Sequence, residues 1–325
     1  MERLDQFMAR ANAAYYALHD PFADFTTAPE ITQVFGEIIG LWCAVVWAML
    51  GQPSPVSFVE FGPGRGTLLA DACRAVAQRM PGFATAHRIH LVETSPRLRA
   101  ILTDRFPHAT LHDDDTSLPD GPMVVVCNEF FDALPIRQTV RRGDGWTERF
   151  VADDALIEAS TDLMPGVSAT EGDVVEVGEA AAGLCRRLAG RIVRQGGAAL
   201  ILDYGPADAG VGDSLQAIRG GGVADPLAEP GTADLTAHVN FASLADVARE
   251  AGATVHGPVP QGMFLARLGL FQRTAALTEK LDPNRAAALT RGARRLAEPD
   301  GMGRLFKAIA ICEAGLPVLP GFERD

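Results

Sequence analysis

The chain has 325 residues, of which 47% are hydrophobic and 22% charged, as in an ordinary folded globular protein. Its formal net charge is −12, which disfavours DNA or RNA as the main partner because a nucleic-acid surface calls for positive charge. The first residues lack a signal-peptide pattern, and the apolar run 38–50 is too short to span a bilayer. We therefore expect a cytoplasmic protein without membrane insertion.

The chain begins with two predicted helices, at 3–18 and about 30–50. Short apolar runs then alternate with helical patterns, which is typical of a parallel sheet covered on both faces. The predicted strands are 57–61, 88–94, 109–113, 122–128, 198–205 and 306–312. The predicted helices are 67–80, 95–106, 176–197 and 241–253. We therefore predict an α/β fold with an open, doubly wound, mostly parallel sheet.

Two segments interrupt this alternation. A polar hairpin is expected at 136–152, turning at Gly143-Asp144-Gly145, and a glycine-rich loop from about 205 to 235. We divide the chain into an N-terminal helical cap, 1–52, and one α/β domain, 53–325. Insertions near 136–175 and 262–300 would form a lid or a smaller substrate subdomain.

The cysteines and histidines give no sign of a disulfide or a metal site. The five cysteines are scattered through apolar stretches without a CxxC pair, as expected for buried thiols in a reducing compartment. The spacing His108-xxx-His112 would place both rings on one face of a strand. We interpret these histidines as solvated strand ends and expect no metal.

The stretch VEFGPGRGTL, residues 59–68, is the first candidate binding site. Gly62, Gly64 and Gly66 lie between a predicted strand and helix, where glycines allow a tight turn and a close approach to a ligand. A phosphate loop would need a lysine after the last glycine, and the dinucleotide fingerprint would need glycine at Thr67. Glu60 would repel a pyrophosphate but can accept a hydrogen bond from an α-ammonium group. This pattern favours S-adenosylmethionine over NAD.

Two further acids end the next predicted strands. Glu93 can accept both ribose hydroxyls, a feature that S-adenosylmethionine and NAD share, so it does not separate the two cofactors. Asp113 could reach the adenine amino group. Glu60 also has a purely structural alternative, in which it pairs with Arg65 or caps a helix.

Several blocks of the sequence resemble the MidA family of S-adenosylmethionine-dependent methyltransferases, and they cover nearly the whole chain. The blocks are DFTTAPEITQVFGEIIGLW (24–42), VEFGPGRGTL, VETSP (92–96), CNEFFDALPIRQ (127–138), LILDYG (200–205) and PGTADLTAHVNF (230–241). The resemblance implies a Rossmann-like class I methyltransferase fold. It also implies symmetric dimethylation of an arginine on a respiratory complex I core subunit, or on its bacterial counterpart.

The resemblance assigns roles to residues of this sequence. Cofactor binding would fall to Glu60, Glu93 and the three glycines of the turn. We add their neighbours Arg65, Thr67 and Ser95, and also Thr27. Thr27 precedes the long helix and could close over the cofactor together with Asp24 and Thr26, although capping of that helix is an alternative role for these residues. The family match also draws attention to Arg219 and Asp234.

The predicted catalytic residues follow the strand 122–128. A carboxylate paired with a guanidinium can orient one nitrogen for methyl transfer. Glu129 is our candidate for that role, with Asp132 second, and Asn128 would position the acceptor. An alternative is that Asn128 and Glu129 cap a short helix formed by FFDALP. Phe130 and Phe131 would line the acceptor channel or belong to the core.

Two other functions remain open at this point. One is an assembly factor that binds S-adenosylmethionine and a partner subunit without turnover. The other is an NAD-dependent oxidoreductase, which Glu60 and Thr67 disfavour.

Overall fold

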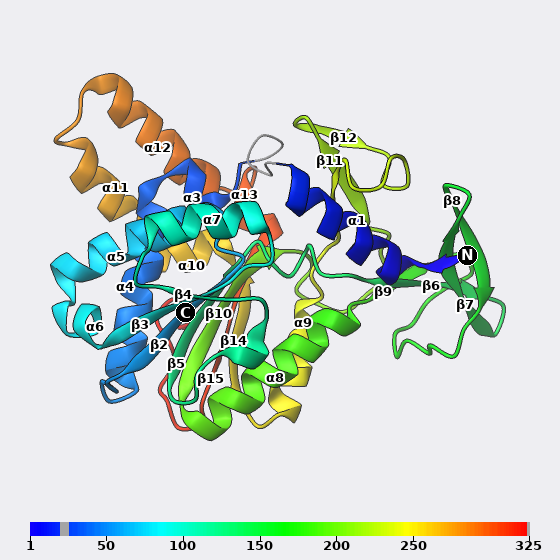
Figure 1. Cartoon of the computed structure of the whole chain (residues 1–325), viewed down its shortest axis with the longest axis horizontal. Coiled ribbons are helices and arrows are strands. Elements are labelled where there is room, and N and C mark those ends of the chain that lie inside the picture. Colours follow the sequence, from blue (N-terminus) through cyan, green and yellow to red (C-terminus); the bar gives the residue numbers. More distant parts are fainter. Residues whose placement is uncertain (20–25, 324–325) are drawn as a thin grey trace.

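The computed structural model describes residues 1–19 and 26–323, and its central feature is a seven-stranded sheet (Figure 1). The strand order is β14-β15-β10-β5-β2-β3-β4. The strands are β2 Val56–Phe61, β3 His87–Val92, β4 Thr110–His112, β5 Met123–Asn128, β10 Gly197–Tyr204, β14 Thr254–Pro260 and β15 Phe306–Cys312. Neighbours from β4 to β10 pair in parallel, whereas β15 is antiparallel to β10 and β14. The predicted mostly parallel sheet is confirmed.

Strand β14 was missed in the sequence because its residues, TVHGPVP, include a glycine and two prolines. Proline lacks the N–H that a central strand needs, but it is tolerated at a sheet edge. Among the described residues β14 pairs only with β15, and its register shifts between His256 and Val259. An edge position and a bulge therefore explain how this sequence forms a strand.

Helices cover both faces of the sheet, as predicted. Successive residues of a strand point to opposite faces; Phe58 and Val124 belong to one hydrophobic cluster, and Val59 and Val125 to the other. The first cluster is completed by α4 (Gln33–Met49) and α5 (Thr67–Arg79), and the second by α8 (Glu179–Gln195) and α9 (Phe241–Glu250). The remaining helices are α3 Ala28–Ile31, α6 Pro81–Ala86, α7 Pro96–Arg105, α10 Gln261–Arg267, α11 Leu270–Thr278, α12 Pro283–Ala297, α13 Met302–Leu305 and the 3₁₀ turn η1 Asp115–Ser117.

The long apolar run near the N-terminus forms most of α4, whose residues Phe35, Ile39 and Trp42 are buried in the first cluster. In residues 1–19 and 26–323, no helix combines the length and the apolarity needed to cross a membrane.

A second, antiparallel sheet extends away from the central one, on the right of Figure 1. Its strands are β1 Glu2–Arg3, β6 Arg137–Arg142, β7 Gly145–Ala152, β8 Ala155–Ser160 and β9 Val174–Val177. The predicted hairpin is β6–β7, which turns at residues 143 and 144. A bidentate pair between Arg137 and the buried Glu148 (both 2.7 Å) joins these two strands.

The glycine-rich segment was expected to be a loop, and that expectation is wrong. It contains a three-stranded sheet of β11 Gln216–Arg219, β12 Gly222–Ala224 and β13 Asp234–Thr236. Gly220 and Gly221 have φ of +59° and +75°, which suits a tight hairpin turn. Helix α1 (Leu4–Leu18) lies against this sheet, with Phe7 and Leu235 in one cluster. This contact places α1 beside the carboxyl edge of the central sheet.

Candidate active site

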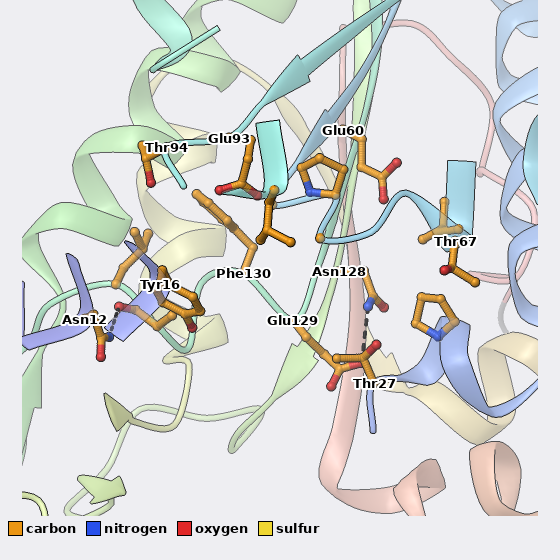
Figure 2. Close-up of a pocket in the computed structure, with 18 of the residues that line it drawn as sticks. Asn12, Tyr16, Thr27, Glu60, Thr67, Glu93, Thr94, Asn128, Glu129 and Phe130 are labelled. Atoms are coloured by element: carbon orange, nitrogen blue, oxygen red, sulfur yellow. Dashed lines mark hydrogen bonds between the residues drawn. The ribbon is translucent and has the colours of Figure 1, made fainter. Parts of the chain in front are cut away.

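A cavity of about 370 Å³, the first cavity, lies where β2, β3 and β5 end. Ligands of open α/β folds bind at this edge of the sheet, beside the point where the strand order reverses. The cavity is also lined by α1 and by Thr27, Pro29 and Glu30. Figure 2 shows Asn12, Tyr16 and Thr27 on the side away from Glu60 and Glu93. Three strand ends and the N-terminal segment therefore enclose it together.

Glu60, near the end of β2, lines the first cavity and is 4% exposed. Its Oε2 atom has no hydrogen-bond partner within the described part of the chain. Burial raises the pKa of Glu60 to about 8, although Arg105 acts in the opposite direction. A buried carboxylate without a partner is costly. The site therefore fits a ligand that brings a cationic hydrogen-bond donor to Glu60.

The glycine turn follows Glu60. Gly62 and Gly66 have φ of +61° and +73°, and α5 begins at Thr67. A Cβ at Gly62 would lie 2.9 Å from the Phe130 ring, and one at Gly66 2.4 Å from the Phe106 ring. Gly62, Gly64 and Thr67 line the first cavity, whereas Gly66 does not. Gly66 therefore serves the turn, and the other three residues shape the cavity.

Glu93 directly follows β3 and also lines the cavity. Burial raises its pKa, while the N–H of Ser95 donates to its Oε1 (2.8 Å). The Ser95 hydroxyl accepts the N–H of Leu98 at the start of α7 and donates to the carbonyl of Tyr16 (2.6 Å). Ser95 does not line the cavity; its place is behind Glu93, which it orients.

Two more predicted cofactor residues lie outside the cavity. The side chain of Asp113 is 85% exposed and pairs with Arg99 (3.0 Å), because the short edge strand β4 has ended and its next residue turns toward solvent. The predicted contact of Asp113 with adenine is not supported by this position. Arg65 contributes its carbonyl to a hydrogen bond from Arg105 (2.6 Å), and it does not line the cavity. Asp24 lies outside the described residues.

Asn128 ends β5, and Glu129 follows it with φ of +50°. Figure 2 shows the two side chains joined by a hydrogen bond, from Nδ2 of Asn128 to Oε1 of Glu129 (3.2 Å). The same oxygen accepts the backbone N–H of Ala28 (2.7 Å). Burial raises the pKa of Glu129 to about 7. The Oδ1 atom of Asn128 is buried without a partner among the described residues. Both side chains line the first cavity.

The residues after Glu129 form a turn and not a helix, so helix capping does not explain Asn128 and Glu129. The backbone N–H groups of Phe130, Phe131 and Asp132 instead donate to Oδ2 of Asp203 at 3.1, 2.9 and 3.3 Å. Asp203 is fully buried near the end of β10. It therefore fixes the course of this loop. Phe130 lines the first cavity, whereas Phe131 belongs to the core.

A second cavity of about 300 Å³ adjoins the first. Tyr16 and Glu129 line both cavities, and Asp132 lines only the second. The other lining residues of the second cavity are Thr26, Tyr204, Gln216, Ile218, Asp234, Thr236, Leu305 and Phe306. Asp132 is 8% exposed, and burial raises its pKa well above the usual range, with Asp203 and Asp234 adding repulsion. The three predicted catalytic residues thus lie around the junction of two cavities.

The contribution of α1 to the site is not evident from the sequence. Asn12 and Tyr16, one helical turn apart, both line the first cavity. Asn12 donates to the carbonyls of Ala133 (3.1 Å) and Leu235 (2.8 Å) and accepts the N–H of Leu235 (3.0 Å). An asparagine on the buried face of a predicted amphipathic helix is a weak signal that could have identified it. Among the described residues, no group of three or more histidines, cysteines or acids could hold a metal ion.

Comparisons with known proteins agree with this geometry. Residues 38–259 match the family described as "Putative S-adenosyl-L-methionine-dependent methyltransferase". The chain is 32% identical, over 95% of its length, to "Protein arginine methyltransferase NDUFAF7, mitochondrial" of Xenopus laevis, and covers 80% of that protein. For the protein of the same name in Homo sapiens, the identity is 31%, with 95% of this chain and 79% of the relative covered.

Two solved structures from Burkholderia thailandensis have the same fold. One has S-adenosylhomocysteine bound and superposes with a TM-score of 0.77 at 24% identity, covering 98% of this chain and 89% of that one. The other is a native structure with a TM-score of 0.80 at 25% identity, covering 99% of this chain and 90% of that one.

The fold and the site define a class I methyltransferase that uses S-adenosylmethionine. The chain belongs to the family of S-adenosyl-L-methionine-dependent methyltransferases that matches residues 38–259, and the resemblance to the MidA family is confirmed. This assignment removes the NAD-dependent oxidoreductase alternative.

Proposed function

We propose that the chain methylates an arginine side chain of a protein, with S-adenosylmethionine as the methyl donor. The observation that carries this proposal is the position of Glu129, a half-buried carboxylate that lines both cavities. One cavity can then hold the donor and the other the acceptor, with Glu129 between them. The names of the relatives in Xenopus laevis and Homo sapiens, protein arginine methyltransferases, support this choice of acceptor.

The first cavity fits the donor through its carboxylates. Glu60, whose Oε2 is buried without a partner, would accept the α-ammonium group, and Glu93 would accept the ribose hydroxyls. Gly62 and Gly64 would lie beside the ligand at the turn, and Thr27 and Thr67 would border it near α5, since all four residues line the first cavity. When bound, S-adenosylmethionine supplies a methyl group on a sulfonium, and the C–S bond electrons stay on sulfur when that group is transferred.

Glu129 would orient the acceptor and take up its proton. The acceptor nitrogen forms one bond to carbon and loses one proton, so a base near neutral pKa is required. The pKa of Glu129, raised by burial to about 7, meets this requirement. Asn128 would hold Glu129 through their hydrogen bond, and Asp132 would add a second carboxylate on the acceptor side.

The partner protein follows from the resemblance to the MidA family. We propose a core subunit of respiratory complex I, or its bacterial counterpart, as the substrate, with symmetric dimethylation of the arginine as the product. The net charge of −12 supports an acceptor segment that is basic.

The experiment compares the wild-type chain with Glu129→Gln in a radiolabelled methyl-transfer assay on the candidate subunit. We expect S-adenosylhomocysteine to bind both with similar affinity, and transfer by Glu129→Gln to be reduced about 100-fold or more. Glu250→Gln, at the exposed end of α9, serves as the matched control and should keep full activity.

Two outcomes would contradict the proposal. Full activity of Glu129→Gln would remove this carboxylate from the reaction. Tight binding of S-adenosylhomocysteine and of the subunit by the wild-type chain, without any methyl transfer, would favour the non-catalytic assembly factor.

A further inference from the structure

The second cavity combines buried acids with more exposed apolar side chains, since Asp132 and Asp234 are 8% and 3% exposed and Leu305 is 48% exposed. Asp132, Asp234 and Glu129 contribute carboxylates from the 129–132 loop and from β13. Leu305 at the end of α13, Phe306 at the start of β15 and Ile218 of β11 contribute apolar side chains. A long side chain with an aliphatic stem and a cationic end matches this distribution, because its stem would contact apolar atoms while its end meets the acids.

We propose that the second cavity receives the guanidinium group of the acceptor, and that Asp132 and Asp234 hold it there. This inference rests on the proposed function and adds the location and the specificity of acceptor binding. Its main support is Asp132, which is 8% exposed, lines the cavity, and has an Oδ1 atom without a partner in the part of the chain that the structure describes. Such an atom calls for a ligand that donates a hydrogen bond.

Other polar residues that line the second cavity are hydrogen-bonded within the protein, whereas Oδ1 of Asp132 has no partner among the described residues. The Tyr204 hydroxyl donates a hydrogen bond to Thr236 (2.6 Å) and accepts one from Gln216 (3.1 Å). Its only proton is therefore already donated within the protein. The Tyr16 hydroxyl donates to Oδ1 of Asp234 (2.7 Å), which fixes that carboxylate at the side of α1. Tyr16 and Tyr204 therefore use their hydroxyl groups in hydrogen bonds within the protein, whereas Asp132 faces the cavity.

The arrangement favours a guanidinium over an ammonium. A guanidinium is planar and presents five N–H donors in fixed directions, whereas an ammonium concentrates its charge at one atom. The carboxylates of the second cavity come from two elements, with Glu129 and Asp132 on one loop and Asp234 on β13. A planar group with several donors can pair with more than one of them at once.

The test follows methyl resonances of the full-length protein by NMR. Ile218 lines only the second cavity and Leu98 only the first, so their methyl groups report on the two sites separately. S-adenosylhomocysteine is added first, and then N-acetyl-arginine methylamide at rising millimolar concentration. We expect the first ligand to shift Leu98 and the second to shift Ile218.

Asp132→Asn and Asp234→Asn should each weaken binding of the arginine derivative about tenfold or more, because each removes a charged acceptor. The affinity for S-adenosylhomocysteine should remain unchanged, which also shows that the variants are folded. Asp208→Asn removes the same charge from an exposed loop and should alter neither affinity. The corresponding lysine derivative should bind the wild-type protein more weakly than the arginine derivative.

The outcomes separate this inference from the proposed function. If S-adenosylhomocysteine does not shift Leu98, the proposed function fails. If S-adenosylhomocysteine does shift Leu98, two results would overturn only the assignment of the second cavity. One is that the arginine derivative leaves Ile218 unshifted, and the other is that it binds the two aspartate variants with the same affinity as the wild-type protein. Equal binding of the lysine derivative would overturn the preference for a guanidinium.

Discussion

The Asp203 carboxylate accepts the backbone N–H of Phe131 at 2.9 Å, although 72 positions separate the two residues in the chain. The same oxygen accepts the N–H groups on either side of Phe131, and Oδ1 accepts the N–H of Tyr204 (2.9 Å). One buried acid at the end of β10 thus determines the path of the loop that carries Glu129 and Asp132. Asp203 does not line either cavity, and we regard it as a positioning residue.

Replacing this acid should loosen the catalytic loop. Asp203→Asn substitutes a neutral acceptor for a charged one that serves four N–H groups, and we expect the free energy of unfolding to fall by about 1–3 kcal/mol. The maximum rate of methyl transfer should fall more than the affinity for S-adenosylhomocysteine changes, because Glu129 is displaced while Glu60 and Glu93 remain. Urea unfolding and steady-state kinetics measure the two effects. An unchanged maximum rate would show that the loop does not depend on Asp203.

The stability of the unliganded protein should fall as the pH rises from about 5 to 8. Burial raises the pKa of Glu60 to about 8 and that of Glu129 and Asp203 to about 7, above their ordinary values near 4. Between these values the folded state binds more protons than the unfolded state, so the free energy of unfolding decreases with pH. Urea unfolding at several pH values measures this slope. In Glu60→Gln the decrease in the free energy of unfolding should be smaller near pH 8. An increase in the stability of the wild-type protein from pH 5 to 8 would contradict the prediction.

Cofactor affinity should depend on pH through Glu60. The ionised carboxylate is the form that pairs with an α-ammonium group, so binding of S-adenosylhomocysteine should become tighter from pH 6 toward pH 8, about the pKa of Glu60. Calorimetric titration of the wild-type protein measures this trend. In Glu60→Gln the affinity should be lower and the increase toward pH 8 absent. The same increase in both proteins would place the ammonium elsewhere.

The turn after β2 offers a test of close packing at the cofactor site. Gly62→Ala places a Cβ 2.9 Å from Phe130 at a residue with φ of +61°, and the left-handed backbone alone costs an L-residue about 1–2 kcal/mol. We expect binding of S-adenosylhomocysteine to weaken about tenfold. Gly143→Ala is the matched control, since Gly143 has φ of +51° with open space around it in the β6–β7 turn. Equal effects of both variants on cofactor affinity would point to a general loss of stability.

Asn12 should be important for the attachment of α1. It is 5% exposed and exchanges three hydrogen bonds with Ala133 and Leu235. Asn12→Ala leaves these backbone groups without partners, and we expect the free energy of unfolding to fall by about 2–3 kcal/mol. Affinity for S-adenosylhomocysteine should also fall, because α1 forms one wall of the first cavity. Gln6→Ala, at an exposed position of the same helix, is the control; thermal unfolding distinguishes the two variants.

The sequence identified most of the central sheet and the donor side of the site. Continuous apolar runs such as PMVVVCN show strands buried on both faces, and the glycines after Glu60 show where β2 turns into α5. It did not show β14 or the small sheet of β11, β12 and β13, whose short strands contain prolines or are bordered by glycines. Asp113 was placed on the site by analogy with other strand ends, but its side chain turns toward solvent.

The sequence by itself determined the alternation of strands and helices, and it determined that Glu60, Glu93 and Glu129 stand at strand ends, because local patterns of hydrophobicity and turn residues encode these features. Only the tertiary structure decided what surrounds them. Helix α1, Asp203 and Asp234 are distant from Glu129 in the chain. Long-range packing alone brings α1 and Asp234 to the cavities, and Asp203 to the loop that carries Glu129. Contacts of this kind leave no local pattern in the sequence, because they depend on residues that are neighbours in space and not in the chain.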